Sequence, residues 1–299
     1  MTTTTTQDTA TKKDWPETAR RLSADFATRA AAHDADDSFV AENYAAMRSA
    51  KLFSAAVPAE LGGGGATFAE HAEMIRILGR GCGSTALAYS MHSHLLQALI
   101  WRHQKGATPP AEPLLRRIAT EEVVLVSTGG SDWLDGSGTL TKQNGTYTFN
   151  AKKIFGSGSP AGDVLLTTGV YDDPEKGPTV LHFGVSMKDP GVKVQDNWRT
   201  MGMRGTGSND IVVQNVAVAD AAVSVRRPKG KWHPFFDVVS PLIFPLIAAA
   251  YVGIAEAARE HAVAQAQKKR DDHIVQSLVG EMDTQLLVAQ DTLAAMVAV

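Results

Sequence analysis

The sequence predicts an α+β protein: an N-terminal all-α domain, a middle antiparallel β-barrel domain and a C-terminal helical bundle. Three observations support this order. Apolar residues recur three and four positions apart up to about residue 120, as in helices that pack on one face. Short runs of alternating apolar and polar residues then extend to about residue 225, and long helical stretches follow from about residue 235. The predicted boundaries are 1–15 for a disordered lead-in, 16–121, 122–226 and 227–299.

Composition narrows the function classes. The 299 residues are 44% hydrophobic, enough for a sizeable core, and the formal net charge of −3 comes from well-mixed acids and bases. This balance argues against nucleic acid or an anionic membrane surface as the main partner. The one cysteine, Cys82, cannot form an internal disulfide and fits a cytoplasmic location. It is either a small packed hydrophobe or a nucleophile.

The N-terminal domain is expected to consist of helices joined by short turns. Thr67, followed three residues later by Glu70, matches a capping box at the start of one of them. Glycines at 79 and 81 are expected to break the long stretch that follows into two helices. The predicted helical ranges are 17–39, 41–57 ending at Pro58, 67–103 with that break, and 110–122.

The middle domain is expected to contain about six short strands. Turn residues separate them, for example Asn144-Gly145 and Asp189-Pro190-Gly191. This spacing is typical of a small antiparallel barrel or sandwich. The alternating runs are 123–128, 138–155, 164–171, 179–187, 192–198 and 210–219.

The C-terminal region is expected to form two long helices, 235–269 and 271–299. The first is kinked or begun at Pro241 and Pro245, and the second is capped by Asp271 or Asp272. The apolar run around the two prolines is too broken to predict a membrane span. The second helix stays apolar to its last residue, so we expect a bundle of which only the first two helices are present, or a covering subunit.

Four short stretches stand out in chain order. They are VSTGGSDWLDG at 126–136, KKIFGSGSPAGDVLLTTG at 152–169, MGMRGTGSNDIVVQNVAVAD at 201–220 and AAAYVGIAEAA at 248–258. Together with the domain order, they resemble the acyl-CoA dehydrogenase superfamily over nearly the whole chain from about residue 16. The 24 residues from Ser131 to Phe155 equal the spacing of the corresponding family positions, although the first stretch is about three residues shorter than the family form.

The resemblance implies a flavin, usually FAD, between the β-domain and the helical bundle. It places the third stretch at a corner of the β-domain close to flavin and substrate. Small side chains and accessible N–H groups suit a flavin ring edge and pyrophosphate, and an aromatic ring suits the isoalloxazine face. The alternative is that these are ordinary turn residues. The predicted cofactor-binding residues are Ser127, Thr128, Gly130, Ser131, Phe155 and Ser157, the last with its hydroxyl near flavin N5.

The resemblance further implies an oxidoreductase that desaturates an acyl-CoA thioester at its α,β bond, with hydride transfer to FAD. That reaction needs a carboxylate base. The glutamate lies late in the bundle in most of the family, and early in the long helix in a few members, at the position of Ile243 here. The arginine that many members carry beside it is Phe244 here, while the following proline is kept as Pro245. The catalytic base therefore stays unknown.

The missing base keeps two alternatives open. One is the monooxygenase branch of the same fold, which takes reduced FMN or FAD from a reductase and uses a helical-domain histidine; His92 is the candidate here. His92 and His94 are otherwise a helix surface or core histidines. Spaced two apart, they do not share a helix face, so no metal site is predicted. The other alternative is a non-catalytic relative.

The predicted partners follow from these readings. They are a small-molecule substrate, acyl-CoA in the dehydrogenase reading, and either an electron-transfer flavoprotein or a flavin reductase. The family's bundle helices imply a homodimer or homotetramer. No nucleic acid and no membrane span are expected.

Overall fold

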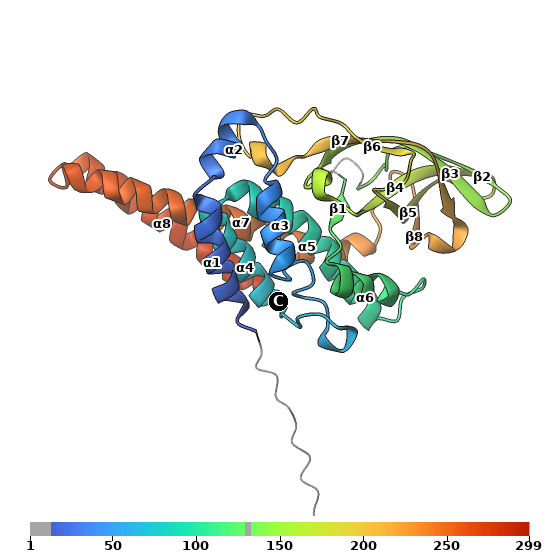
Figure 1. The fold of residues 1–299 in the computed structure, drawn as a ribbon, viewed down its shortest axis with the longest axis horizontal. Helices are drawn as coiled ribbons and strands as arrows, with labels where there is room; N and C mark the ends of the chain where they lie inside the picture. The colour runs from blue at the N-terminus through green and yellow to red at the C-terminus, as the bar shows by residue number, and fades with distance from the viewer. Residues whose placement is uncertain (1–12, 129–132, 299) are drawn as a thin grey trace, which may run out of the picture.

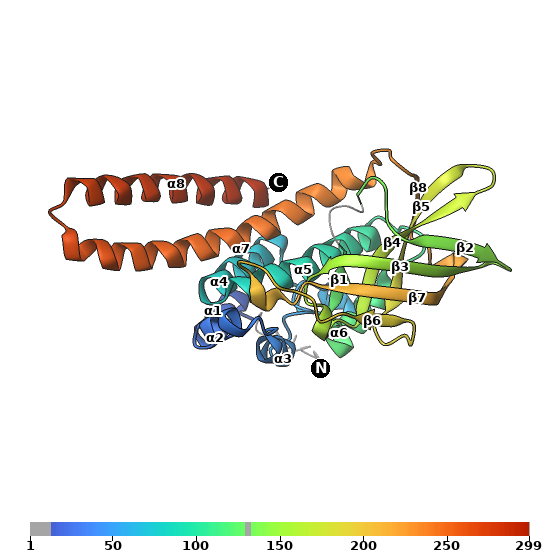
Figure 2. The same cartoon turned by 90° about the horizontal axis from the view of Figure 1, so that it is seen from above.

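The computed structural model describes residues 13–128 and 133–298. A helical layer packs against one end of a curled sheet, and the last two helices form a hairpin whose far part projects away from both (Figures 1 and 2). The predicted order of helical, β-rich and helical regions is therefore confirmed. The N-terminal helices are α1 Trp15–Ala27, α2 Ala30–Asp36, α3 Ala41–Ser49, α4 Phe68–Gly81, α5 Gly83–Gln104 and α6 Glu112–Glu121, with the 3-10 turn η1 Ala59–Leu61.

Two predicted helices end earlier than the sequence pattern indicates. The stretch 17–39 is two helices, because the chain leaves the helical conformation at Arg29, whose side chain bonds Asn43. The stretch 41–57 is helical only to Ser49. Beyond it the backbone N–H groups of Phe53 and Ser54 donate to the buried carboxylate of Glu122, which replaces the helical bonds.

The glycines near residue 80 serve close packing and do not break the helix where predicted. Thr67 and Glu70 form the expected capping box at the start of α4, but α4 runs through Gly79 and the break falls at Cys82. A Cβ at Gly79 would lie 2.6 Å from the carbonyl oxygen of Ala250 on α7. Glycine therefore lets two helices touch at this point.

The middle region is one eight-stranded sheet in the order β6-β7-β3-β2-β4-β5-β8, with β1 paired to β4. Most ladders are antiparallel as predicted, but β1 and β2 each pair with β4 in parallel. Among the described strands the order has two ends, so the sheet curls around its core without a closing hydrogen-bond ladder. The strands are β1 Leu125–Ser127, β2 Thr139–Gln143, β3 Thr146–Gly156, β4 Val164–Asp173, β5 Gly177–Ser186, β6 Val192–Val194, β7 Asn209–Ala219 and β8 Val225–Pro228.

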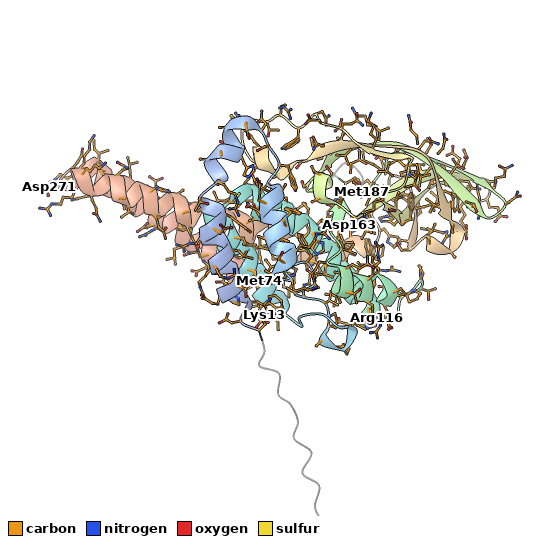
Figure 3. The ribbon with its side chains drawn as sticks, in the orientation of Figure 1. Lys13, Met74, Arg116, Asp163, Met187 and Asp271 are labelled. Carbon is orange, nitrogen blue, oxygen red and sulfur yellow. The ribbon has the colours of Figure 1, made fainter. Side chains whose placement is uncertain are left out.

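The C-terminal hairpin consists of α7 Phe235–Ala266 and α8 His273–Val297. Pro241 and Pro245 lie within α7, and Asp272 caps α8 by accepting bonds from two backbone N–H groups. Figure 2 shows α8 running back along the far half of α7, and Figure 3 shows Asp271 at the tip. The stretch Phe235–Lys269 is long and apolar enough to span a membrane, but 44% of its apolar window is buried inside the protein.

The helical layer and the sheet are joined by buried polar contacts. The Arg48 guanidinium donates to Asp163 at 3.0 Å, and the same carboxylate oxygen accepts from the backbone N–H of Val124 at 2.9 Å. Figure 3 shows Asp163 at the junction of the two layers. Because β1 starts at this junction, its residues are held in a fixed place beside α5.

Candidate functional site

A cavity of about 450 Å³ lies between the helices and the sheet. The C-terminal half of α5 and the start of α6 form one wall, while β4, β5 and the end of β1 form the opposite wall. The first turns of α7 complete it. Trp133 and Phe236 stack here with ring centroids 5.0 Å apart, which gives the cavity an aromatic side. A volume of this size suits a small, largely apolar ligand.

His92, the predicted catalytic histidine of the monooxygenase reading, does not line this cavity. Its Nδ1 accepts from the backbone N–H of Leu125 at 3.0 Å, so the proton is on Nε2, which donates to the Phe53 carbonyl at 2.9 Å. Burial lowers the pKa of His92 to about 4. Both ring nitrogens are therefore occupied by backbone groups, and the geometry makes His92 a neutral structural link.

His94 lines the cavity instead. Its Nδ1 lies 3.2 Å from the carbonyl oxygen of Ser90, which can only accept, so Nδ1 carries the proton and Nε2 keeps its lone pair. Burial lowers the pKa of His94 to about 4, so the ring is neutral at physiological pH. No hydrogen bond to Nε2 is formed by any residue of 13–128 or 133–298. His94 therefore offers the cavity a hydrogen-bond acceptor in a fixed tautomer.

Two of the predicted flavin-binding residues reach the same cavity. Ser127 and Thr128 lie where β1 ends, and both line it. The Thr128 hydroxyl lies 3.1 Å from that of Thr167 on β4, which ties the end of β1 to the sheet. Gly130 and Ser131, the other two residues predicted in this stretch, lie outside the described residues, and their role stays a prediction.

Phe155 lies on β3, outside the cavity lining, in an unusual conformation. The pairing of β3 with β7 shifts register between Lys153 and Gly156, and Phe155 has a φ of 58°. That region is strained for a bulky side chain and is found mostly where surrounding structure enforces it. Phe155 is 55% exposed, and its ring forms a T-shaped pair with the Trp198 ring, with the two centroids 5.9 Å apart. An exposed aromatic face on a strand bulge fits a planar cofactor.

Ser157 begins a directed chain of hydroxyl groups. Its oxygen lies 2.8 Å from that of Ser208, which lies 2.8 Å from that of Thr206, and Thr206 donates to the Met203 carbonyl. Each hydroxyl has one proton. The Thr206 hydroxyl proton goes to the Met203 carbonyl. Ser208 must therefore donate to Thr206, and Ser157 must donate to Ser208. Ser157 is thereby left able only to accept a further hydrogen bond.

The positions of the early glutamate and its neighbouring arginine in the family correspond to Ile243 and Phe244 on α7. Ile243 lines the cavity, whereas Phe244 is half exposed and its ring centroid lies 6.4 Å from that of Trp133. Among the described residues that line the cavity, none is aspartate or glutamate. In the same described part of the chain, no three histidine, cysteine or carboxylate side chains gather as a metal site would require.

Sequence reasoning missed the face that α5 presents to the cavity. Its residues share one side of the helix, since each lies three or four positions from the next along that side. A single-sequence pattern does not distinguish this face from a core face, because α5 is apolar on most sides and His92 stands beside it. The face consists of His94, Leu95, Ala98, Leu99 and Arg102.

Comparisons with known proteins agree with this architecture. The model of the acyl-CoA dehydrogenase N-terminal domain matches residues 9–109, and that of the acyl-CoA dehydrogenase middle domain matches residues 126–216. The chain is 29% identical over 300 residues to the putative acyl-CoA dehydrogenase YdbM of Bacillus subtilis (strain 168), covering 93% of this chain and 75% of that protein. It is 29% identical over 280 residues to the dibenzothiophene monooxygenase of Mycolicibacterium goodii, covering 88% of this chain but only 66% of the relative.

A solved structure supports the same architecture with a flavin present. KijD3 in complex with FMN and an amino-keto sugar nucleotide superposes with a TM-score of 0.84 at 26% identity. The match covers 96% of this chain and 74% of the KijD3 chain. The two relatives thus differ in the activity that their names give, and KijD3 shares the fold of this chain.

Proposed function

Because the chain belongs to the acyl-CoA dehydrogenase superfamily of flavin-dependent oxidoreductases, we propose that it is a monooxygenase that uses reduced flavin and oxygen. Its substrate is a small, largely apolar molecule bound in the cavity beside Ser127 and Thr128. The observation that carries the proposal is the chemistry of that cavity. Its described lining has a neutral histidine acceptor, and Ile243 stands where a few dehydrogenases of this family carry the carboxylate base that thioester desaturation needs.

The residues present fit a flavin. The exposed face of Phe155 and the acceptor hydroxyl of Ser157 would hold its ring, and Ser127 with Thr128 would hold its edge. FMN is bound in the KijD3 complex, and FAD is usual in the dehydrogenase branch, so reduced FMN or FAD is the cofactor we propose. When bound and reduced, a flavin supplies the electrons that activate oxygen for transfer to a substrate.

The direction of the hydroxyl chain favours the reduced cofactor. A reduced flavin ring carries an N–H at N5, where the oxidised ring has a bare acceptor nitrogen. Ser157 can only accept, because its own proton goes to Ser208. An acceptor matched to the N–H stabilises the reduced form, whereas against the oxidised ring two acceptors would face each other.

The protein residues have distinct tasks in the proposed reaction. The apolar walls exclude water from the reacting centre, which strengthens the polar contacts inside. The His94 Nε2 accepts a hydrogen bond from the substrate, and the Ser90 carbonyl holds its tautomer. A flavin reductase is the proposed electron donor, and a cytoplasmic location stays a prediction.

The proposal is tested by titrating the purified protein anaerobically with oxidised and with reduced FMN and FAD. We expect the reduced form to bind at least about tenfold more tightly, and oxygen then to be consumed with substrate oxygenation. Reduction of a bound flavin by any of a panel of acyl-CoAs would overturn the monooxygenase and establish the dehydrogenase.

The dehydrogenase is the second candidate, because the YdbM relative spans 93% of this chain. In that case the substrate is an acyl-CoA and the electron acceptor an electron-transfer flavoprotein. Ile243, which lines the cavity at the position where a few members of the family carry the base, counts against it. The acyl-CoA titration separates the two candidates in a single experiment.

A further inference from the structure

The last turn of α5 places an arginine in the cavity wall. Arg102 is 9% exposed and lines the cavity. One nitrogen of its guanidinium donates to the backbone carbonyls of Thr108 and Pro109, both at 3.3 Å. These are long, neutral contacts, so most of the five donors of this group are left for another partner.

Unlike Arg76 and Arg48, Arg102 has no carboxylate partner in the described chain. Arg76 pairs with Glu73 and Glu256, and Arg48 pairs with Asp163. Burial lowers the pKa of Arg102, and no neighbouring acid opposes that effect, but a guanidinium remains charged in proteins. Burying a cation without a partner destabilises the fold, unless a bound ligand supplies the opposite charge.

The rest of the cavity supports a ligand with an apolar body and a negative end. Between His94 and Arg102 the α5 face consists of leucines and an alanine, and the two polar ends are eight residues apart, about 12 Å along the helix. Arg117 of α6 also lines this end and is ion-paired with Glu121. None of the described lining residues is an acid that could compete with a ligand for the guanidinium groups of Arg102 and Arg117.

We propose that Arg102 binds an oxyanion of the substrate, a carboxylate or a sulfonate-like group, at the end of an apolar body that lies along α5. This rests on the proposed function, since the cavity is taken as the substrate site. A planar guanidinium binds such a group through two parallel hydrogen bonds. The same chemistry could be supplied by the phosphate of FMN, and the experiment separates the two sources.

The test uses two probes of nearly equal size, 2-naphthylacetate and 2-naphthylacetamide, titrated calorimetrically into the full chain. We expect the acetate to bind about tenfold or more tightly than the amide, as charged hydrogen bonds allow. Arg102→Met should remove that preference and leave amide binding unchanged, whereas Arg102→Lys should keep part of it. Arg116→Met is the matched control, since Arg116 pairs with Glu112 outside the cavity.

Three outcomes would overturn the proposal. They are equal affinity of the wild-type chain for both probes, no measurable binding of the acetate, and a preference for it that survives in Arg102→Met. A parallel titration with reduced FMN and reduced riboflavin assigns the source. If Arg102→Met weakens FMN but not riboflavin, the arginine binds the flavin phosphate instead. Neither probe depends on turnover, so the result stands apart from the test of the monooxygenase.

Discussion

The Nδ1 atom of His92 accepts a hydrogen bond from the backbone N–H of Leu125 at 3.0 Å. This bond joins α5 to the first residue of β1, and Nε2 of the same ring donates to Phe53 on the loop after α3. One buried side chain therefore holds together three segments that lie far apart in the sequence. Ser127 stands two residues beyond the bond, so His92 acts on the cavity through the placement of β1.

Replacing His92 with alanine should destabilise the fold and leave the chemistry intact in the molecules that remain folded. The change opens a cavity and leaves two buried backbone groups without partners, which costs about 3–5 kcal/mol of unfolding free energy. Urea unfolding followed by circular dichroism measures this cost. The control is His103→Ala on the same helix, which should cost less than about 1 kcal/mol. A stable His92→Ala protein that binds flavin but has lost oxygenation would restore a catalytic role.

His92 and His94 also show what the sequence can and cannot predict. The order of regions, the Thr67–Glu70 capping box and the Asp272 cap follow from local patterns, and all three are present. Which histidine reaches the cavity does not follow from local patterns. His92 and His94 differ by about 200° around the helix, and only the packing of β1 against α5 decides which of the two is covered.

Helix ends that depend on tertiary contacts could not be predicted from the sequence either. The segment after Ser49 has the composition of a helix, but the buried carboxylate of Glu122, distant in sequence, takes its N–H groups. The parallel pairing of β1 and β2 with β4 likewise depends on where the chain enters the sheet. Alternation along single strands gives no information on that choice.

Replacing His94 should impair catalysis without affecting flavin binding. His94→Ala removes the fixed acceptor, and we expect kcat/KM for oxygenation to fall about 100-fold, the lower end of the usual contribution of such a group. His94→Gln puts an amide near the Nε2 position and should recover part of the loss. Flavin affinity, measured by fluorescence quenching, should change less than about twofold. Full activity in His94→Ala would remove this residue from the mechanism.

Replacing Ser208 should weaken the preference for reduced flavin. In Ser208→Ala the proton of Ser157 is no longer committed, so this hydroxyl can donate to an oxidised ring as well as accept from a reduced one. We expect the ratio of oxidised to reduced Kd values to fall about threefold to tenfold. Ser23→Ala is a control on α1, outside the cavity, since its hydroxyl donates to the Ile77 carbonyl. An unchanged ratio in Ser208→Ala would contradict the directed chain.

Stability should fall as the pH falls from about 6.5 toward 4. Burial lowers the pKa of His71 to about 3 and those of His92 and His94 to about 4, below the ordinary 6.5. In this window the unfolded chain binds protons that the folded chain does not, which costs up to about 1.4 kcal/mol per pH unit for each histidine. Glu122 acts in the opposite direction, because burial raises its pKa.

This pH dependence is measured by urea unfolding at pH 7.5, 6.0 and 5.0. The contribution of the histidines is fully present above pH 6.5 and is lost progressively below it. His94→Gln removes one titrating group and should make the slope between pH 6 and 5 shallower. A slope that His94→Gln leaves unchanged would show that the His94 ring takes up its proton as readily in the folded protein as in the unfolded chain.

Two glycines of the C-terminal hairpin should respond to alanine in opposite directions. A Cβ at Gly253 of α7 would lie 1.9 Å from the Arg76 carbonyl oxygen of α4, a backbone atom that cannot move alone. Gly253→Ala should therefore push the two helices apart and cost about 2–3 kcal/mol. Gly280 lies in α8 with no neighbouring atom within 4 Å of the place that an added methyl group would take, so Gly280→Ala should add up to about 1 kcal/mol through helix propensity.

Thermal unfolding of both variants checks this prediction, with the wild-type chain as reference. Since α7 also forms a wall of the cavity through Ile243, Gly253→Ala should weaken binding of the naphthyl probes as well, whereas Gly280→Ala should leave it unchanged. A Gly253→Ala protein as stable as the wild type would mean that α4 and α7 are farther apart than the structure has them. The small residues of the stretch 248–258 would then have no packing role.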